Sequence, residues 1–177
     1  IMYRNGWGVP KDDAEAVRWY GLAAEQGIAL AQLNLGFMYS SGHGVLQDQT
    51  KATYWYRLAA EQGLAEAQFN LGIRYGYGLG IPKDVAEAIR WYRVAAEQGL
   101  AEAQYNLGLI YLNGNGVAQD YSEAARWFRL AAEQGHAGAR NNLGLIYLNG
   151  NGVVQDYSEA ARWFRLAAEQ GHAGARN

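Results

Sequence analysis

Apolar residues recur at helical spacing along one stretch of the chain. In residues 100–112, Ala103, Leu107 and Tyr111 lie four positions apart, so they share one face of a helix. An apolar face of this kind is stable only when it is buried against another element. The pattern therefore predicts a first helix at 100–112 that packs on a partner helix.

A second helix is predicted at about 120–134, where alanine and aromatic positions return every three to four residues. Asp120 precedes it, and Glu123 stands where a capping box needs it, so Asp120 accepts backbone N–H bonds while Glu123 reaches back. Gly135 ends the helix, because glycine reaches the left-handed cap conformation without a steric penalty. On the exposed side, Glu123 and Arg126 are oppositely charged neighbours.

The helix pair recurs with a period of 36 residues. The string Ala-Glu-Gln-Gly ends at Gly27, Gly63, Gly99, Gly135 and Gly171. We therefore divide the single array 1–177 into a partial repeat with a complete second helix at 1–27, full repeats at 28–63, 64–99, 100–135 and 136–171, and the start of a further repeat at 172–177. Residues 107–141 and 143–177 differ at one of 35 positions, which indicates a recent duplication.

Glycines mark two further places in each repeat. A pair such as Gly114 and Gly116 separates the helices and precedes one apolar residue, Val117, which we expect to lie buried under the hairpin. A single glycine such as Gly108 lies inside each first helix, where it costs about 1 kcal/mol relative to alanine. Close approach of a large ring, from the Trp or Tyr of a second helix, would explain why glycine is there.

Composition narrows the classes of function. The chain has 177 residues, 15 Lys+Arg against 17 Asp+Glu, a net charge of −2, and no cysteine. The balanced charge disfavours nucleic acid as a partner, and the missing cysteine excludes disulfides and thiol chemistry. No apolar run reaches the roughly 20 residues of a membrane span, so we expect no membrane insertion.

Reactive side chains do not gather in any recognisable motif. His43, His136 and His172 are spread over the repeats, which predicts no metal site. The glycine-rich run 76–80 lacks the strand and spacing of a phosphate loop, and 113–116 has too few carboxylates for a calcium loop. We therefore expect a non-catalytic protein without a metal or cofactor.

The repeat unit as a whole resembles a known family. The residues that carry the likeness are Ala-Glu-Ala-Gln-Tyr-Asn-Leu-Gly at 101–108, Tyr111, Gly-x-Gly-Val at 114–117, Asp120, Ala124, Trp127 and Ala-Ala-Glu-Gln-Gly at 131–135. They are similar to the Sel-one-like repeat (SLR), a relative of the tetratricopeptide repeat, over essentially the whole chain. The resemblance implies an all-α fold, a right-handed α-solenoid of 36-residue antiparallel helix–turn–helix repeats whose first helices line a concave surface.

The same resemblance implies a function. Family members are adaptors and scaffolds, so a protein or peptide partner is expected on the concave face. Many bacterial relatives are exported, which slightly favours a periplasmic or secreted location and leaves a cytoplasmic one open. Residues 1–3 match the tail of a first helix and 172–177 the opening of another, so we expect either a longer array or ends that stack on neighbouring molecules.

The tetratricopeptide analogy also predicts groove residues. The asparagines before each Leu-Gly would point inward: Asn34, Asn70, Asn106 and Asn142. The residues before them change from apolar through aromatic to polar: Leu33, Phe69, Tyr105 and Asn141. Primary amides would bind the backbone of a peptide without demanding its sequence. The alternative is structural, with each asparagine bonded to a backbone group of the adjacent repeat.

Arg74 is a further candidate, because the equivalent residues Met38, Ile110 and Ile146 are apolar. It either pairs locally or meets an acidic group on a ligand. Two other functions stay open for the chain as a whole. One is a structural or oligomerisation spacer that stacks through its ends, and the other is a carbohydrate- or cell-wall-binding module. The second needs exposed aromatics, whereas most aromatics here occupy repeat-invariant positions that predict a core.

Overall fold

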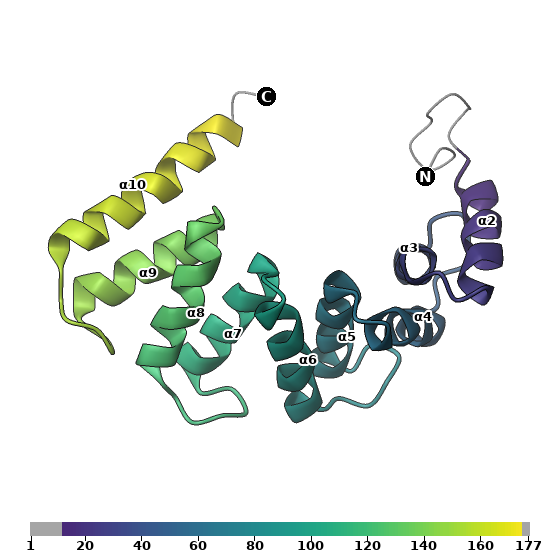
Figure 1. The fold of residues 1–177 in the computed structure, drawn as a ribbon, viewed down its shortest axis with the longest axis horizontal. Coiled ribbons are helices and arrows are strands. Elements are labelled where there is room, and N and C mark those ends of the chain that lie inside the picture. Colours follow the sequence, from purple (N-terminus) through teal and green to yellow (C-terminus); the bar gives the residue numbers. More distant parts are fainter. Residues whose placement is uncertain (1–11, 175–177) are drawn as a thin grey trace. The chain divides into compact units, whose positions relative to one another are not determined.

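The computed structural model describes residues 12–174 of the chain. In this range the chain forms nine helices and no strand (Figure 1). Their bounds are α2 Asp13–Glu25, α3 Ala29–Ser41, α4 Gln49–Glu61, α5 Ala65–Tyr77, α6 Val85–Glu97, α7 Ala101–Asn113, α8 Tyr121–Glu133, α9 Ala137–Asn149 and α10 Tyr157–Gly174. The expected helix tail at 1–3 and the last residues of the expected further repeat, 175–177, lie outside the described residues.

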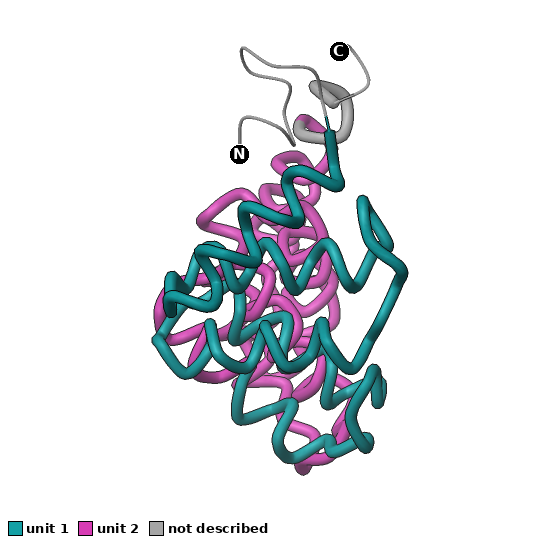
Figure 2. The backbone as a smooth tube through the Cα atoms, turned by 90° about the vertical axis from the view of Figure 1, so that its right-hand side faces the viewer, with its two compact units in different colours: residues 1–91 teal, residues 92–177 magenta. Residues whose placement is uncertain are grey.

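The chain divides into two compact units, residues 1–91 and 92–177, which Figure 2 colours teal and magenta. In the first unit, α3 packs against α2 and α4, and α4 packs against α5. In the second unit, α8 packs against α7 and α9, and α9 packs against α10. Each first helix is therefore held by second helices, as the apolar stripe in the sequence predicts. None of the described helices is long and apolar enough to cross a lipid bilayer.

The predicted caps form at the start of every described second helix. The carboxylates of the five capping aspartates each accept a backbone N–H three residues on at 2.9 to 3.0 Å: Asp12, Asp48, Asp84, Asp120 and Asp156. Of the two roles predicted for the glutamate of the box, the structure shows the pairing with arginine. Its carboxylate pairs with the arginine three residues later, as in Glu123–Arg126 at 3.2 Å. The aspartate alone thus caps the helix.

In three of the first helices, α3, α7 and α9, the internal glycine makes room for an aromatic ring, as predicted. A Cβ atom on Gly108 would lie 2.5 Å from the ring of Phe128, and one on Gly144 would lie 2.7 Å from Phe164. In the first unit, a Cβ atom on Gly36 would lie 2.9 Å from the ring of Tyr56. The ring comes from the residue that follows the repeat tryptophan, so the tyrosine prediction holds for Gly36 and the tryptophan one does not.

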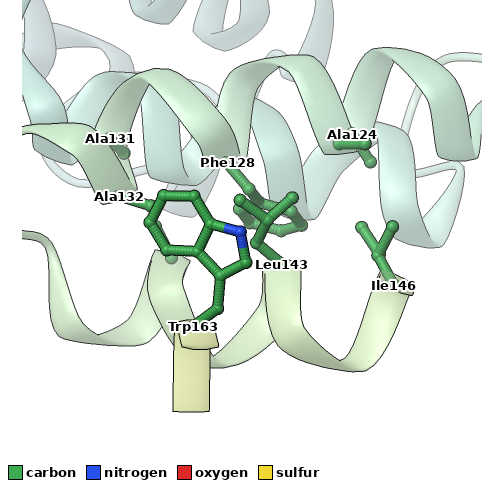
Figure 3. Packing of buried hydrophobic residues seen from close by; sticks show 9 residues of the cluster. Ala124, Phe128, Ala131, Ala132, Leu143, Ile146 and Trp163 are labelled. Carbon is green, nitrogen blue, oxygen red and sulfur yellow. The ribbon is translucent and has the colours of Figure 1, made fainter. Parts of the chain in front are cut away.

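The core of the second unit lies between α8 and α9. Figure 3 shows Leu143 against Phe128, with the indole of Trp163 beside them and Ile146 nearer to Ala124. Phe128 and Leu143 are completely buried. Val153, from the glycine turn, is partly buried against this cluster, and Val45 has the same place in the first unit. The expected apolar residue under the hairpin is therefore present in both units.

One helix end differs from the prediction. In the other repeats the chain turns at glycines with positive φ, such as Gly135 at 94°, but α10 continues through Gly171 to Gly174. Glycine costs only about 1 kcal/mol inside a helix, which is too little to end it alone. Where the turn forms, a side chain of the following first helix also binds the last carbonyls, and the residue equivalent to it, Arg176, lies outside the described residues.

Candidate interaction surface on the first helices

Buried glutamines, which the sequence analysis did not single out, join each first helix to the preceding second helix. Their side-chain amides donate to a backbone carbonyl at the end of that helix: Gln32 to Ala24 at 3.1 Å, Gln68 to Ala60 at 3.2 Å and Gln104 to Ala96 at 3.1 Å. Each of the three is 4% exposed. A buried side-chain amide without an acceptor would be costly, so these bonds hold adjacent helices at a fixed spacing.

The glutamine contacts extend to the next helix along the chain. Gln62 donates to the Gln32 side-chain oxygen at 2.7 Å, and Gln134 donates to that of Gln104 at 2.8 Å. In the last repeat Arg140 replaces the glutamine and its Nε donates to the Ala132 carbonyl at 3.0 Å. The repeat pattern contains a signal for these residues, because a polar residue recurs directly after the buried alanine of each first helix.

The four predicted asparagines lie at half-buried positions of the first helices. The amide of Asn34 donates to the carbonyl of Leu30 at 2.7 Å, and that of Asn70 to the carbonyl of Glu66 at 2.8 Å, one turn earlier in the same helix. Within residues 12–174, no hydrogen bond is found for the side chains of Asn106 and Asn142. The buried glutamines, and not these two asparagines, therefore provide the polar links between helices in the second unit.

The residues that precede the asparagines differ in accessibility. Leu33 is partly buried against the cluster around Leu71, and Phe69 is half-buried. The ring of Tyr105 stacks on that of His136 at 4.3 Å and lies 5.8 Å from that of Phe128. Asn141 alone is exposed. Three of the four predicted positions thus contribute to packing as well as to the surface.

Apolar side chains flank the asparagines on the same helices. Phe37 and Leu145, three residues after an asparagine, are each 42% exposed, while Ile73 and Leu109 are half-buried. Leu148 is 37% exposed one turn further along α9. In the second unit the side chain of Asn142 therefore stands beside exposed leucines.

Arg74 is buried in the first unit. It is 4% exposed, its guanidinium donates to the side-chain oxygens of Gln49 and Ser40, and it lies 5.2 Å from the centre of the Tyr56 ring. Burial raises the pKa of the Tyr56 phenol, and the positive charge of Arg74 opposes this. The geometry favours the local role of the two that the sequence left open.

The outer sides of the second helices carry tryptophans covered by arginine. Arg90 lies 4.4 Å from the ring of Trp91, and Arg126 lies 4.7 Å from the ring of Trp127. Both tryptophans are buried, at 9% and 5% exposed. Trp19 and Tyr54 in the first unit are open, at 50% and 56%. Three of the five described tryptophans, Trp91, Trp127 and Trp163, thus belong to the core, while Trp19 remains open.

No group of three or more His, Asp or Glu side chains gathers as a metal site among the side chains described in residues 12–169. His43 bonds the hydroxyl of Ser41 at 2.8 Å. The Nδ1 atom of His136 accepts the backbone N–H of Ala139 at 3.1 Å and so caps α9. His43 and His136 therefore have local structural contacts, and the side chain of His172 lies outside the described ones.

Comparison with known proteins connects this architecture to solved structures. A protective antigen present in uropathogenic Escherichia coli strains, which displays an SLR fold, is 42% identical to the chain with a TM-score of 0.93, over 96% of this chain and 36% of its own. A Sel1 repeat protein from Oxalobacter formigenes is 41% identical with a TM-score of 0.91, over 96% and 69%. Cysteine rich protein B of Helicobacter pylori is 25% identical with a TM-score of 0.56, over 71% and 90%.

The chain thus spans 36% of the Escherichia coli antigen and 69% of the Oxalobacter protein. No curated protein matches it. The family model for the Sel1 repeat matches five consecutive segments, at residues 1–28, 29–64, 65–100, 101–136 and 137–172. These matches and the two high TM-scores confirm the predicted all-α solenoid of helix–turn–helix repeats, and the chain belongs to the Sel1 repeat family.

Proposed function

We propose that this chain is a non-catalytic protein–protein interaction module, and that it binds an extended, uncharged segment of a partner along α7 and α9. Sel1 repeat proteins are generally interaction scaffolds, which supports the class of function. The observation that supports the place is the pair Asn106 and Asn142. Their amides have no hydrogen-bond partner within residues 12–174 although they lie on well-packed helices.

Charge on these helices is scarce, which supports an uncharged ligand. The sequence of α7 contains one charged residue, Glu102, and that of α9 contains one, Arg140. The guanidinium of Arg140 donates to the carbonyls of Ala132 and Leu166. A ligand would therefore be held by amide hydrogen bonds and by contact with leucines such as Leu145, and its affinity would depend little on salt.

Extended peptides suit such a surface because their backbone groups lack internal partners. A primary amide offers both donors and an acceptor, so one asparagine binds a peptide N–H and C=O together. Each such bond contributes roughly 0.5–1.5 kcal/mol, while a buried apolar anchor on a nearby leucine adds most of the affinity. The alternative of a spacer that stacks through its ends predicts no ligand on this face.

The test uses peptides selected on the full chain from a random display library. The double variant Asn106→Ala/Asn142→Ala should bind these peptides about ten-fold or more weakly, since two amide contacts are lost, and its melting temperature should stay within a few degrees of the parent. Arg126→Ala/Arg162→Ala on the second helices is the matched control and should bind normally. Unchanged peptide binding by the asparagine variant would contradict the proposal, and a large loss of stability would show that the amides are structural.

A further inference from the structure

The turns of the second unit contain a sequence that the fold does not require. They read Asn-Gly-Asn-Gly at 113–116 and 149–152, whereas the equivalent turns of the first unit read Ser-Gly-His-Gly at 41–44 and Tyr-Gly-Leu-Gly at 77–80. The glycines of all four turns have φ between 67° and 80°. Because Ser, His, Tyr and Leu support the same backbone, the asparagines are not needed to form the turn.

An asparagine followed by glycine is chemically labile. The backbone nitrogen of the glycine loses its proton and attacks the side-chain amide carbon of the asparagine, a five-membered succinimide forms, and ammonia leaves. Water then opens either carbonyl of the ring to give aspartate or isoaspartate. The net reaction consumes one water and releases one ammonia. It is fastest before glycine, which has no side chain to obstruct the attack.

The structure separates the four Asn-Gly pairs of the second unit into two classes. In the first pair of each turn, the attacking nitrogen already donates a hydrogen bond at a helix end. The N–H of Gly114 donates to the carbonyl of Ile110, and the N–H of Gly150 donates to that of Ile146. Removing this proton requires opening the helix cap, so Asn113 and Asn149 are protected.

The second pair of each turn has no such protection. Within residues 12–174, no hydrogen bond is found for the N–H of Gly116 or Gly152. Asn115 is exposed and Asn151 is half-buried. From these contacts we propose that Asn115 and Asn151 are spontaneous modification sites, which deamidate to aspartate and isoaspartate while Asn113 and Asn149 in the same turns persist.

The consequence for the protein differs between the two products. Aspartate adds one negative charge to a chain whose net charge is −2. Isoaspartate also lengthens the main chain by one carbon, directly before Gly116 or Gly152. Gly152 has no free space, since a Cβ atom there would lie 2.5 Å from the backbone nitrogen of Ser122, and its carbonyl accepts the Ser122 hydroxyl at 2.9 Å. Isoaspartate at Asn151 should therefore loosen this turn from the start of α8.

The experiment is a time course of the folded protein at mildly alkaline pH, followed by proteolysis and mass spectrometry of the turn peptides. Deamidation should be about two- to ten-fold faster at Asn115 than at Asn113, because one cap hydrogen bond protects the latter. Asn151 should react more slowly than Asn115 because it is half-buried, but faster than Asn149. In strong denaturant the four rates should become similar, which shows that the fold and not the sequence sets the difference.

The double variant Asn115→His/Asn151→His, which takes its residue from the turn at 41–44, provides the control. It should keep the melting temperature of fresh parent protein and retain that temperature after ageing, whereas the aged parent should melt lower. Equal rates at all four asparagines in the folded protein, or faster reaction at Asn113 and Asn149, would overturn the proposal. No detectable deamidation in the folded protein alongside rapid reaction in denaturant would overturn it as well.

Discussion

Equivalent buried positions in the two units hold residues of opposite polarity. In the first unit, Arg74 is 4% exposed and binds the side chains of Gln49 and Ser40 beside the Tyr56 ring. In the second unit, 72 residues further on, Ile146 takes the position of Arg74 and is 2% exposed, and Phe128 takes the position of Tyr56 and is completely buried.

The comparison shows that the residues of this site change together. The positions of Ser40 and Gln49 correspond to Leu112 and Tyr121 in the second unit. A buried guanidinium is tolerated only where hydrogen-bond acceptors and a ring surround it, whereas an isoleucine needs apolar neighbours. One backbone thus accepts either a polar set or an apolar set, and a mixture of the two should be unstable.

The largest effect is expected from placing the polar residue alone in the apolar unit. Ile146→Arg should lower the free energy of unfolding by about 3–5 kcal/mol, because it buries a charge without acceptors. Urea unfolding, with hydrogen exchange to locate the change in α8 and α9, measures it. Adding Leu112→Ser, Tyr121→Gln and Phe128→Tyr should recover part of the loss. A variant as stable as the parent would show that the site opens to water, and the comparison would fail.

A smaller effect is expected where a glycine faces the ring. Gly108→Ala should cost about 1–3 kcal/mol, because the new Cβ would stand 2.5 Å from the Phe128 ring. Gly21→Ala in α2 is the matched control, since nothing lies within 4 Å of that position, and alanine should stabilise the helix there by about 0.5–1 kcal/mol. Thermal unfolding of both variants measures the two changes in stability. If both variants were stabilised, or both destabilised, the prediction would be contradicted.

The smallest effect concerns alkaline pH and arises at Tyr56 in the first unit. Desolvation raises the pKa of the Tyr56 phenol above its usual value of 10.0, although Arg74 opposes the shift. The folded protein therefore keeps this proton when the unfolded chain loses it, so stability is complete below pH 10.0 and falls as the pH rises through the folded value.

Tyr56→Phe, which copies the residue at position 128, removes this group. Its unfolding midpoint in urea should fall less steeply with alkaline pH than that of the parent. A parallel fall in both proteins would show that other tyrosines cause the dependence. Phe128→Tyr in the second unit tests the converse, and it should introduce an alkaline loss there together with the cost of a buried hydroxyl without a partner.

The candidate site was predicted only in part. The positions of Asn106 and Asn142 on the first helices followed from the spacing, but the roles of the other polar residues did not. Glutamines such as Gln104 form the polar links, and their bond to a carbonyl joins residues eight positions apart across a turn. Whether a side chain at such a position reaches solvent or a neighbouring carbonyl depends on the distance between helices, which periodicity does not contain.

Arg74 is another residue whose surroundings the sequence predicted only in part. The sequence marked it as different from its apolar equivalents, and the structure shows that residues 25 and 34 positions away supply its partners. The tryptophans were predicted to belong to the core, which holds for Trp127 at 5% exposed and not for Trp19 at 50%. Identical residues at equivalent repeat positions thus have different surroundings.

By itself the sequence determined the repeat, the helices, their caps and the need for glycine beside a ring, because each depends on spacing within one repeat and on local backbone preferences. Only the tertiary structure decided which polar groups face a neighbouring helix and whether position 74 is surrounded by acceptors. Those properties arise from contacts between helices distant in the chain, where burial removes the competition of water and makes each missing partner costly.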